Sequence, residues 1–222
     1  MSENKVVTTD ARGNIKIMTF DKYSLYTAST AAGQRARMVF GIRDGNPRIT
    51  VFTNDPADTT EKTRGMISAP MDGVTFMGFL NLIKKVAATQ GESSFSVDCL
   101  TSVRDDSGKI TDKILLCKAY VGKDSEGNVF LSLIADGRPR IKFPLAISSY
   151  HSFNKADGTQ LTAAEASTIA ATALSEILTT LYKAFIIDAV KEQIATPRQP
   201  AGNRTAQRSG PGPDTLFEDI PV

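Results

Sequence analysis

The stretch Arg35–Phe52, RARMVFGIRDGNPRITVF, decides the fold of this protein. Apolar and polar residues alternate along most of it, and a period of two is typical of β-strands with one buried face. The segment Asp44-Gly45-Asn46-Pro47 in its middle favours a tight turn. We therefore expect antiparallel strands near 35–43 and 47–53, with an aliphatic face and a cationic face.

The same pattern continues on both sides of this hairpin. Short β-branched and aromatic runs bounded by Gly, Asn, Asp and Pro predict further strands near 14–20, 65–71, 94–103, 112–122, 128–135 and 139–147. Helices are predicted over 74–89 and over about 162–195, where the second begins with a Thr-x-x-Glu capping box. Four strands and a helix thus occur twice, over 14–89 and 94–196, as a repeat of pattern without sequence identity.

These predictions place the chain in the α+β class. We expect mainly antiparallel β-sheet built from two four-strand-plus-helix units, followed by a long C-terminal helix and a disordered tail. An oligonucleotide-binding (OB) fold barrel is the alternative, because the strands from 14 to 122 and the 74–89 helix can also be threaded that way. Residues 1–196 are predicted to form one domain, which is long enough to bury its own core.

Composition narrows the class of protein. The chain is 41% hydrophobic and 23% charged, which is typical of soluble globular proteins. The two cysteines, Cys99 and Cys117, belong to no C-x-x-C or Cys/His cluster, so we expect core-facing thiols in a reducing compartment. A polar N-terminus and no run of about 18 apolar residues predict a cytoplasmic protein without signal peptide or membrane span.

The sequence offers no recognisable catalytic site. Its single histidine, His151, has no Ser/Asp or Cys arrangement to complete, and no Walker loop, G-x-G-x-x-G opening a helix or H-E-x-x-H occurs. Acidic pairs such as Asp105-Asp106 lie in predicted turns. We therefore expect a protein that is not an enzyme and that uses no cofactor and no metal.

Positive charge is concentrated in the strand-rich part of the chain. The formal charge is only +2, but residues 1–160 hold 21 Lys and Arg against 17 Asp and Glu, whereas residues 161–196 hold 2 against 4. A local basic patch matters more for attracting phosphates than the charge of the whole chain. Proteins that bind single strands combine such cations with exposed aromatic rings, on which unpaired bases stack.

Alternation places cations and aromatic residues together on one face of the predicted strands. We expect this face to bind single-stranded DNA through Lys16, Phe20, Arg35, Arg37, Arg43, Arg48, Phe52, Lys118, Tyr120, Phe130, Arg140 and Lys142. Tyr23 and Tyr26, in a loop rich in Ser, Thr and Ala, are further candidates for stacking. The opposing interpretation is that any antiparallel sheet with one wet face shows Lys and Arg alternating with apolar residues. Paired units with basic wet faces are similar in architecture to the PC4 and Whirly families, which bind single strands on curved sheets.

From Thr196 onward the composition changes. Residues 197–213 contain no large apolar side chain, so they cannot offset the entropy cost of ordering, and we expect a disordered linker. Residues 214–222, DTLFEDIPV, come after it as an acidic tip. This tip resembles the C-terminal tip of bacterial single-stranded DNA-binding proteins. The residues that match or replace the family pattern are Phe217, Glu218, Asp219, Ile220, Pro221 and Val222, the last in place of a terminal Phe.

The resemblance implies that these six residues recruit replication, recombination and repair proteins. We therefore expect a phage single-stranded DNA-binding protein that coats DNA without sequence specificity in the cytoplasm of a bacterial host. A helix of about 34 residues is about 50 Å long, which favours a dimer or tetramer assembled through it. The alternative function is a structural or scaffold protein that uses the long helix for assembly.

Overall fold

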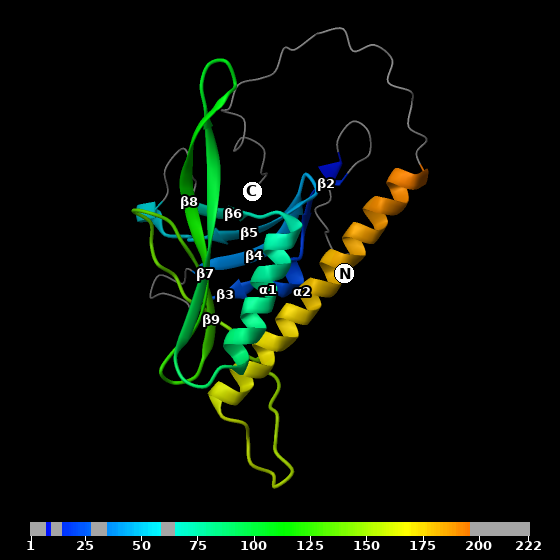
Figure 1. Cartoon of the computed structure of the whole chain (residues 1–222). Helices are drawn as coiled ribbons and strands as arrows, with labels where there is room; N and C mark the ends of the chain where they lie inside the picture. Colours follow the sequence, from blue (N-terminus) through cyan, green and yellow to red (C-terminus); the bar gives the residue numbers. More distant parts are fainter. Residues whose placement is uncertain (1–7, 10–14, 28–34, 59–64, 196–222) are drawn as a thin grey trace.

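The computed structural model describes residues 8–9, 15–27, 35–58 and 65–195. These residues form two antiparallel sheets and two helices (Figure 1). Each sheet precedes its helix along the chain, so the predicted repeat of four main strands and a helix is confirmed, as is the α+β class. The predicted linker (197–213) and tip (214–222) lie outside the described residues.

Sheet A belongs to the first unit. Its strands are β1 (Thr8–Thr9), β2 (Ile15–Thr19), β3 (Leu25–Tyr26), β4 (Arg37–Arg43), β5 (Asn46–Phe52) and β6 (Met66–Pro70), with the 3₁₀ helices η1 (Asp21–Tyr23) and η2 (Pro56–Asp58) between them. The strand order is β1-β2-β4-β5-β6, and β3 pairs with β4. Asp44 and Gly45 turn the β4–β5 hairpin with φ angles of 51° and 79°, the left-handed conformation that a two-residue type I′ turn requires.

Sheet B belongs to the second unit. Its strands are β7 (Ser93–Arg104), β8 (Ile110–Lys123), β9 (Val129–Ile134) and β10 (Phe143–Pro144), in the order β10-β9-β8-β7. The strand predicted over 139–147 is wrong for most of its length, because only β10 pairs with β9. Pro139 and Pro144 lack the N–H that a ladder needs, which explains why pairing stays short.

The two sheets remain separate in the described part of the chain. β6 does not pair with β1, and β7 does not pair with β10, so neither sheet closes into a barrel. The alternative of an OB-fold barrel is therefore wrong. β6 instead packs against β8 and β9 of the other sheet, and the thiol of Cys117 donates to the carbonyl oxygen of Ser68 at 3.4 Å. Both cysteines are buried free thiols, as predicted.

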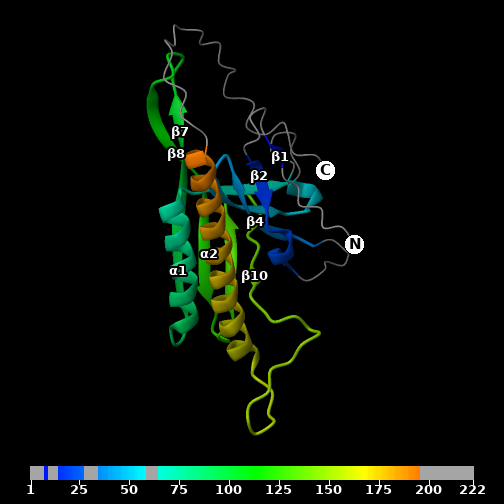
Figure 2. The same cartoon turned by 90° about the vertical axis from the view of Figure 1, so that its right-hand side faces the viewer.

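Helices α1 (Gly73–Ala88) and α2 (Ala163–Ala195) lie side by side against the sheets (Figures 1 and 2). α1 contacts strands of both sheets, whereas α2 contacts α1 and β9. One core joins them: Phe40 of sheet A, Phe79 of α1, Leu131 of sheet B and Leu178 of α2 are each at most 1% exposed. Burial of each such side chain stabilises the fold by about 1.5–3 kcal/mol.

The start of α2 confirms the predicted capping box. The hydroxyl of Thr162 accepts a hydrogen bond from the Glu165 amide at 3.2 Å, and the Glu165 carboxylate accepts one from the Thr162 amide at 2.8 Å. By length and composition alone, Ala163–Ala189 could also cross a membrane, but the core helix of a soluble protein passes the same test. Leu178 and Tyr182 of this segment are buried in the core.

Candidate nucleic-acid interface

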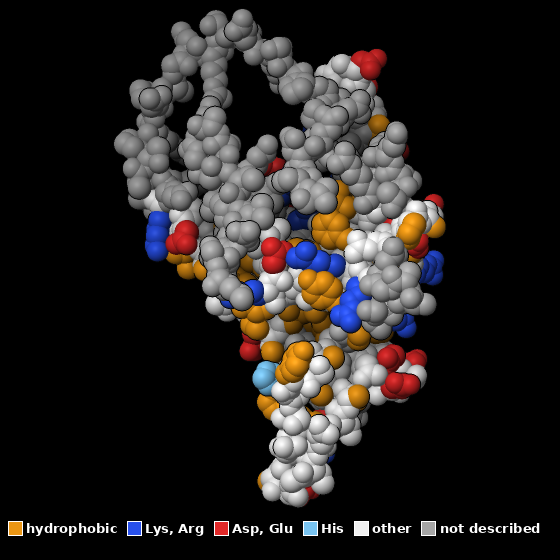
Figure 3. All heavy atoms as spheres, turned by 180° about the vertical axis from the view of Figure 1, so that it is seen from behind, with side chains coloured by type: hydrophobic (Ala, Val, Ile, Leu, Met, Phe, Trp, Pro, Cys, Tyr) orange, Lys and Arg blue, Asp and Glu red, His pale blue; other side chains and the backbone are white. Residues whose placement is uncertain are grey.

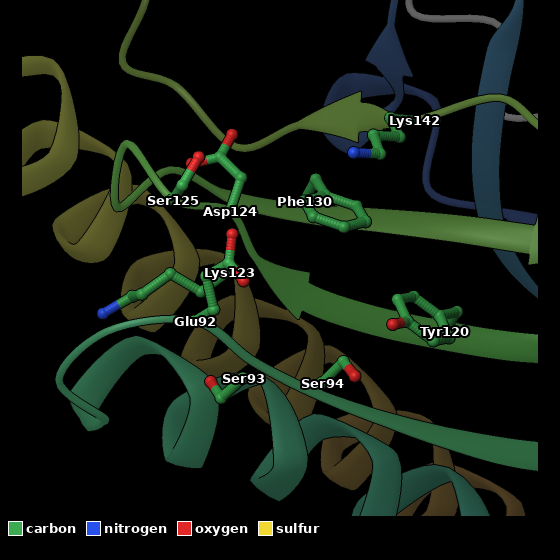
Figure 4. Close-up of a pocket in the computed structure, with 9 residues that line it drawn as sticks. All are labelled: Glu92, Ser93, Ser94, Tyr120, Lys123, Asp124, Ser125, Phe130 and Lys142. Atoms are coloured by element: carbon green, nitrogen blue, oxygen red, sulfur yellow. The ribbon is translucent and has the colours of Figure 1, made fainter.

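Two aromatic rings stack on the solvent-facing side of sheet B, called here its outer face. The centroids of Tyr120 and Phe130 are 6.1 Å apart, and the ring planes differ by 24° (Figure 4). The sequence predicts that both residues share a wet face, and the structure brings them together from β8 and β9. Paired rings on an open sheet offer a flat apolar surface of the kind on which unpaired bases stack.

Gly122 makes this stack possible. It lies opposite Phe130 in the β8–β9 register, and a Cβ atom added to it would come within 2.6 Å of the Phe130 ring. The Phe130 ring therefore covers the glycine backbone and leans toward Tyr120. Sequence reasoning missed Gly122, although a glycine inside a strand flanked by aromatic residues is a known sign of close approach.

Lys142 supplies the positive charge beside the rings. Its ammonium nitrogen lies 4.5 Å from the centroid of the Phe130 ring, which is a cation–π contact (Figure 4). Pro144, two residues later, pairs with Phe130, so the short strand β10 holds Lys142 over the ring. Lys142 is exposed, and Arg140 in the same loop is exposed as well. The stacked rings and Lys142 are called the Phe130 platform below.

The Phe130 platform forms one end of a shallow groove with a volume of about 400 Å³. The rest of the groove is lined by Glu92, Ser93, Ser94, Lys123, Asp124 and Ser125 (Figure 4). The Lys123 ammonium turns away to the end of α1, where it donates to the carbonyl oxygens of Ala87 at 2.8 Å and Thr89 at 2.7 Å. The groove therefore has a cationic, aromatic end and an acidic end, and sequence reasoning did not find the acidic end.

Other residues of the outer face of sheet B offer less exposed positive charge or less exposed surface to a ligand. The ammonium of Lys118 pairs with the carboxylate of Asp98 at 3.4 Å, which neutralises part of its charge. Ser132, which strand alternation places on the same face as Phe130, is only 4% exposed. The outer face of sheet B is therefore not open to solvent along its whole length.

The predicted arginines of the sheet A strands lie on the face of the sheet away from the core. They are partly buried, whereas Lys142 of sheet B is exposed. Arg37 donates to Asp21 and Ser24, and its guanidinium lies 5.9 Å from the centroid of the Tyr26 ring. Tyr26 is 50% exposed, so this pair offers a second ring and cation. The half-buried Phe52 lies opposite Arg37 in the β4–β5 register.

Arg43 and Arg48 form a partly buried pair of like charges on the same face. Burial lowers the pKa of the Arg48 guanidinium, and the charge of Arg43 lowers it further, against a smaller opposing effect of Asp44. Arg43 also forms an ion pair with the carboxylate of Asp44 at 3.7 Å, so the cluster keeps a net positive charge that can attract an anion such as phosphate. Viewed from behind, Lys and Arg side chains gather beside apolar side chains in the middle of the described surface (Figure 3).

Four other predicted residues belong to sheet A or to the segments that flank its strands. Phe20 and Tyr23 are partly buried and pack against the core, so only part of each ring is open to solvent. The strand period fails at Phe20 because β2 ends at Thr19 and the chain turns into η1. Arg35 is exposed just before β4. Lys16 lies in β2, but its side chain is outside the described part of the chain.

The two cationic surfaces meet at one corner of the molecule. β3, which carries Tyr26, contacts β10, which comes directly after Lys142 in the chain.

The residues of the predicted tip, from Phe217 to Val222, lie outside the described residues. Within the described residues, no group of His, Cys, Asp and Glu is arranged to hold a metal ion.

Comparisons with known proteins assign this chain to no family. No protein-family model, no curated protein and no solved structure matches the chain. The similarity to the PC4 and Whirly families thus remains a prediction from the pattern of strands and helices. A function for this chain is therefore inferred from the geometry of the Phe130 platform.

Proposed function

We propose that this protein binds single-stranded DNA, without sequence specificity and without catalysis, on the outer face of sheet B. The observation that carries the proposal is the Phe130 platform: Tyr120 and Phe130 stack at 6.1 Å, and Lys142 lies 4.5 Å from the Phe130 ring centroid. An unpaired base that stacks on such a ring gains about 1–3 kcal/mol. Lys142 lies where it can meet the phosphate that accompanies that base.

The chemistry favours single strands over duplex. In a duplex the faces of the bases are stacked on one another, so no base face is available to stack on the rings of Tyr120 and Phe130. The groove is open and shallow, and the platform offers ring faces rather than a fixed set of donors and acceptors. Every base has a π-face, so binding through ring faces tolerates any sequence.

The charges of the groove suggest the path of the strand. Phosphates are attracted at the Lys142 end and repelled at the end that carries Glu92 and Asp124. We therefore propose that the strand leaves the platform toward β10 and β3, where it next meets Tyr26 and Arg37. Arg43 and Arg48 lie farther along β4 and β5 and provide the next cationic position.

The remaining parts of the proposal rest on the sequence. The tip, residues 214–222, is proposed to recruit replication, recombination and repair proteins in the cytoplasm of a bacterial host, with the gene carried by a phage. The chain is also proposed to form a homo-oligomer. Removal of residues 214–222 should leave DNA affinity unchanged or higher, because an acidic segment no longer competes for the basic surface, while recruitment is lost. A marked loss of DNA affinity would contradict this model of the tip.

The decisive experiment measures fluorescence anisotropy of labelled oligo-dT and of a duplex of equal length, at several salt concentrations. We expect tight, salt-sensitive binding of oligo-dT and weak binding of the duplex. Tyr120→Leu should weaken oligo-dT binding about tenfold, since it removes one stacking surface but keeps apolar bulk. Lys142→Gln should reduce the slope of log affinity against log salt by about 0.7, the value for one phosphate contact on a single strand.

Matched controls separate the platform from general effects. Tyr150→Leu removes a tyrosine that is 91% exposed in a loop, and Lys183→Gln removes an exposed cation from α2. Both should leave oligo-dT affinity and its salt slope unchanged. Equal losses in the platform variants and the controls would show that the platform is not the binding surface.

The second candidate function is that of a scaffold protein assembled through α2. The observation that favours it is the exposure of apolar side chains along this helix: Ile169, Ile186 and Ile187 are between 41% and 52% exposed. A scaffold is expected to ignore both oligo-dT and duplex in the anisotropy experiment. It should also lose its assembly on Ile186→Lys and Ile187→Lys.

A further inference from the structure

The hairpin of β7 and β8 extends well beyond the body of the molecule as a two-stranded arm (Figure 1). The arm comprises residues 100–116, beyond the paired Cys99 and Cys117. Its tip is an ordered turn, in which the carboxylate of Asp105 accepts hydrogen bonds from the amides of Ser107 at 3.0 Å and Lys109 at 2.9 Å. A two-stranded ribbon without a third strand is marginally stable alone. The arm therefore needs an explanation beyond its own pairing.

Both faces of the arm are apolar and exposed. Six aliphatic residues are between 37% and 52% exposed: Leu100, Val103, Ile110, Ile114, Leu115 and Leu116. Leu100 lies opposite Leu115, and the next pair is Thr101 with Ile114, so these two pairs point to opposite faces. Movement of the arm toward the described body of the same chain would cover only one of these faces, so we consider another protein chain as the partner.

The charges of the arm argue against nucleic acid as that partner. Residues 100–116 contain three cations and three anions, which are Arg104, Lys109, Lys113, Asp105, Asp106 and Asp112. A surface that binds phosphates through counterion release needs an excess of cations. The arm has none, and its exposed side chains are branched aliphatics rather than rings. A protein surface suits it better.

β7 is also an edge strand. It pairs with β8 on one side, and no described strand pairs with its other side. β7 has 12 residues and contains neither proline nor lysine, two residues that often protect an edge from pairing with another chain. Its ladder with β8 has irregularities at Cys99/Leu100 and Val103/Arg104, and between them the edge is regular. Its carbonyl and amide groups form a template for one more antiparallel strand.

We propose that β7 pairs with β7 of a second copy of this chain, in an antiparallel arrangement centred on Thr101. Asp98 and Arg104 are each three residues from Thr101, so a two-fold axis there places Asp98 of each copy opposite Arg104 of the other. Asp98 and Arg104 belong to the same face of β7, as this symmetry requires. Asp98 also pairs with Lys118 of its own chain at 3.4 Å, so each Asp98 would lie between two cations. The arm is thus self-complementary in charge, and the pairing gives Leu100 and Val103 neighbours from the other copy. This interface does not depend on the proposed function.

The test uses the full chain without DNA and measures its mass by sedimentation equilibrium over a range of concentrations. The wild type should have the mass of a multiple of two chains. Arg104→Glu places a carboxylate opposite Asp98 at two symmetry-related positions, and we expect the dissociation constant to rise about tenfold. The double variant Asp98→Arg with Arg104→Glu exchanges the charges across the interface and should restore part of the association, because the new arginine also lies opposite Lys118 of its own chain.

Lys109→Glu is the matched control, because it makes the same change of charge at the arm tip, outside the paired residues. It should leave the dissociation constant unchanged, and circular dichroism should show the same fold for every variant. A wild type with the mass of one chain at all concentrations would overturn the proposal. So would equal effects of Arg104→Glu and Lys109→Glu, or association that is lost only on Ile186→Lys in α2.

Discussion

Arg138, in the loop after β9, donates hydrogen bonds to both carboxylate oxygens of Asp58 in η2, one of them at 2.6 Å. The contact joins the second unit to the first. The Asp58 side chain is 4% exposed and the Arg138 side chain 16% exposed, so the pair lies largely out of solvent. Arg138 also donates to the carbonyl oxygen of Met66 at 3.2 Å, and the Thr53 hydroxyl donates to Asp58 at 2.6 Å. This cluster holds the two sheets in their relative position.

Asp58→Asn should therefore destabilise the whole fold rather than one unit. The hydrogen bonds from Arg138 hold the pKa of Asp58 below its usual range, and the amide leaves a largely buried guanidinium without its counter-charge. We expect the free energy of unfolding in urea to fall by about 3 kcal/mol. Asp136→Asn, an exposed change in the loop that carries Arg138, is the control and should stay within about 0.5 kcal/mol. Similar losses in both variants would refute the role of the ion pair.

The N-terminus of α2 should show a defined dependence on pH. A hydrogen bond from Lys155, with further bonds from Thr162, lowers the pKa of Glu165 to about 2. The folded pKa lies below the unfolded value of about 4.3, so the ionised Glu165 carboxylate stabilises the folded state. This stabilisation is fully present above about pH 4.3 and is lost as pH falls toward 2. Glu165→Gln should flatten the fall in unfolding free energy across that interval. Unchanged curves for the two proteins would contradict the assignment.

Ser167 should matter for the packing of α2 on sheet B. Its buried hydroxyl donates to the Leu145 carbonyl at 2.6 Å and accepts from the Val129 amide at 2.8 Å. Ser167→Ala leaves that amide unsatisfied in the core, so we expect a loss of about 1–3 kcal/mol in unfolding free energy, measured by urea titration. Thr180→Ala, whose hydroxyl bonds only within the exposed side of α2, should cost much less.

Gly122→Ala should impair single-strand binding without unfolding the protein. The added Cβ would meet the Phe130 ring at 2.6 Å and the Tyr120 ring at 3.1 Å, so the stacked rings must shift. We expect oligo-dT affinity to fall several-fold in fluorescence anisotropy, while circular dichroism stays unchanged. Gly78→Ala is the control, because an alanine there meets nothing within 4 Å in the middle of α1. It should raise stability by about 0.5–1 kcal/mol and leave DNA affinity alone.

Local features of the fold were predictable because neighbours in sequence create them. The alternation in Arg35–Phe52 predicted the buried and polar faces of β4 and β5, and Asp44-Gly45 predicted their turn. The capping box predicted the start of α2. Where the local pattern was misleading, the backbone left the strand conformation, as at Phe20, or proline prevented pairing, as before β10.

The candidate site was only partly predictable. Alternation assigned Tyr120, Phe130 and Lys142 to solvent, but it could not bring them together, because strand register and the β9–β10 loop decide which side chains meet. For the same reason Lys123 was not expected to bind the end of α1, nor Arg37 to be held by Asp21.

The sequence by itself determined the order of the main strands and helices, the buried face of most of these strands and the compositional change at residue 196, because each depends on residues close together in the chain. Tertiary structure alone decided that the two units share one core, that Arg138 reaches Asp58, and that Phe130 lies over Gly122 beside Lys142. These contacts join residues distant in sequence, and their geometry results from how two twisted sheets and two helices pack, which no local pattern encodes.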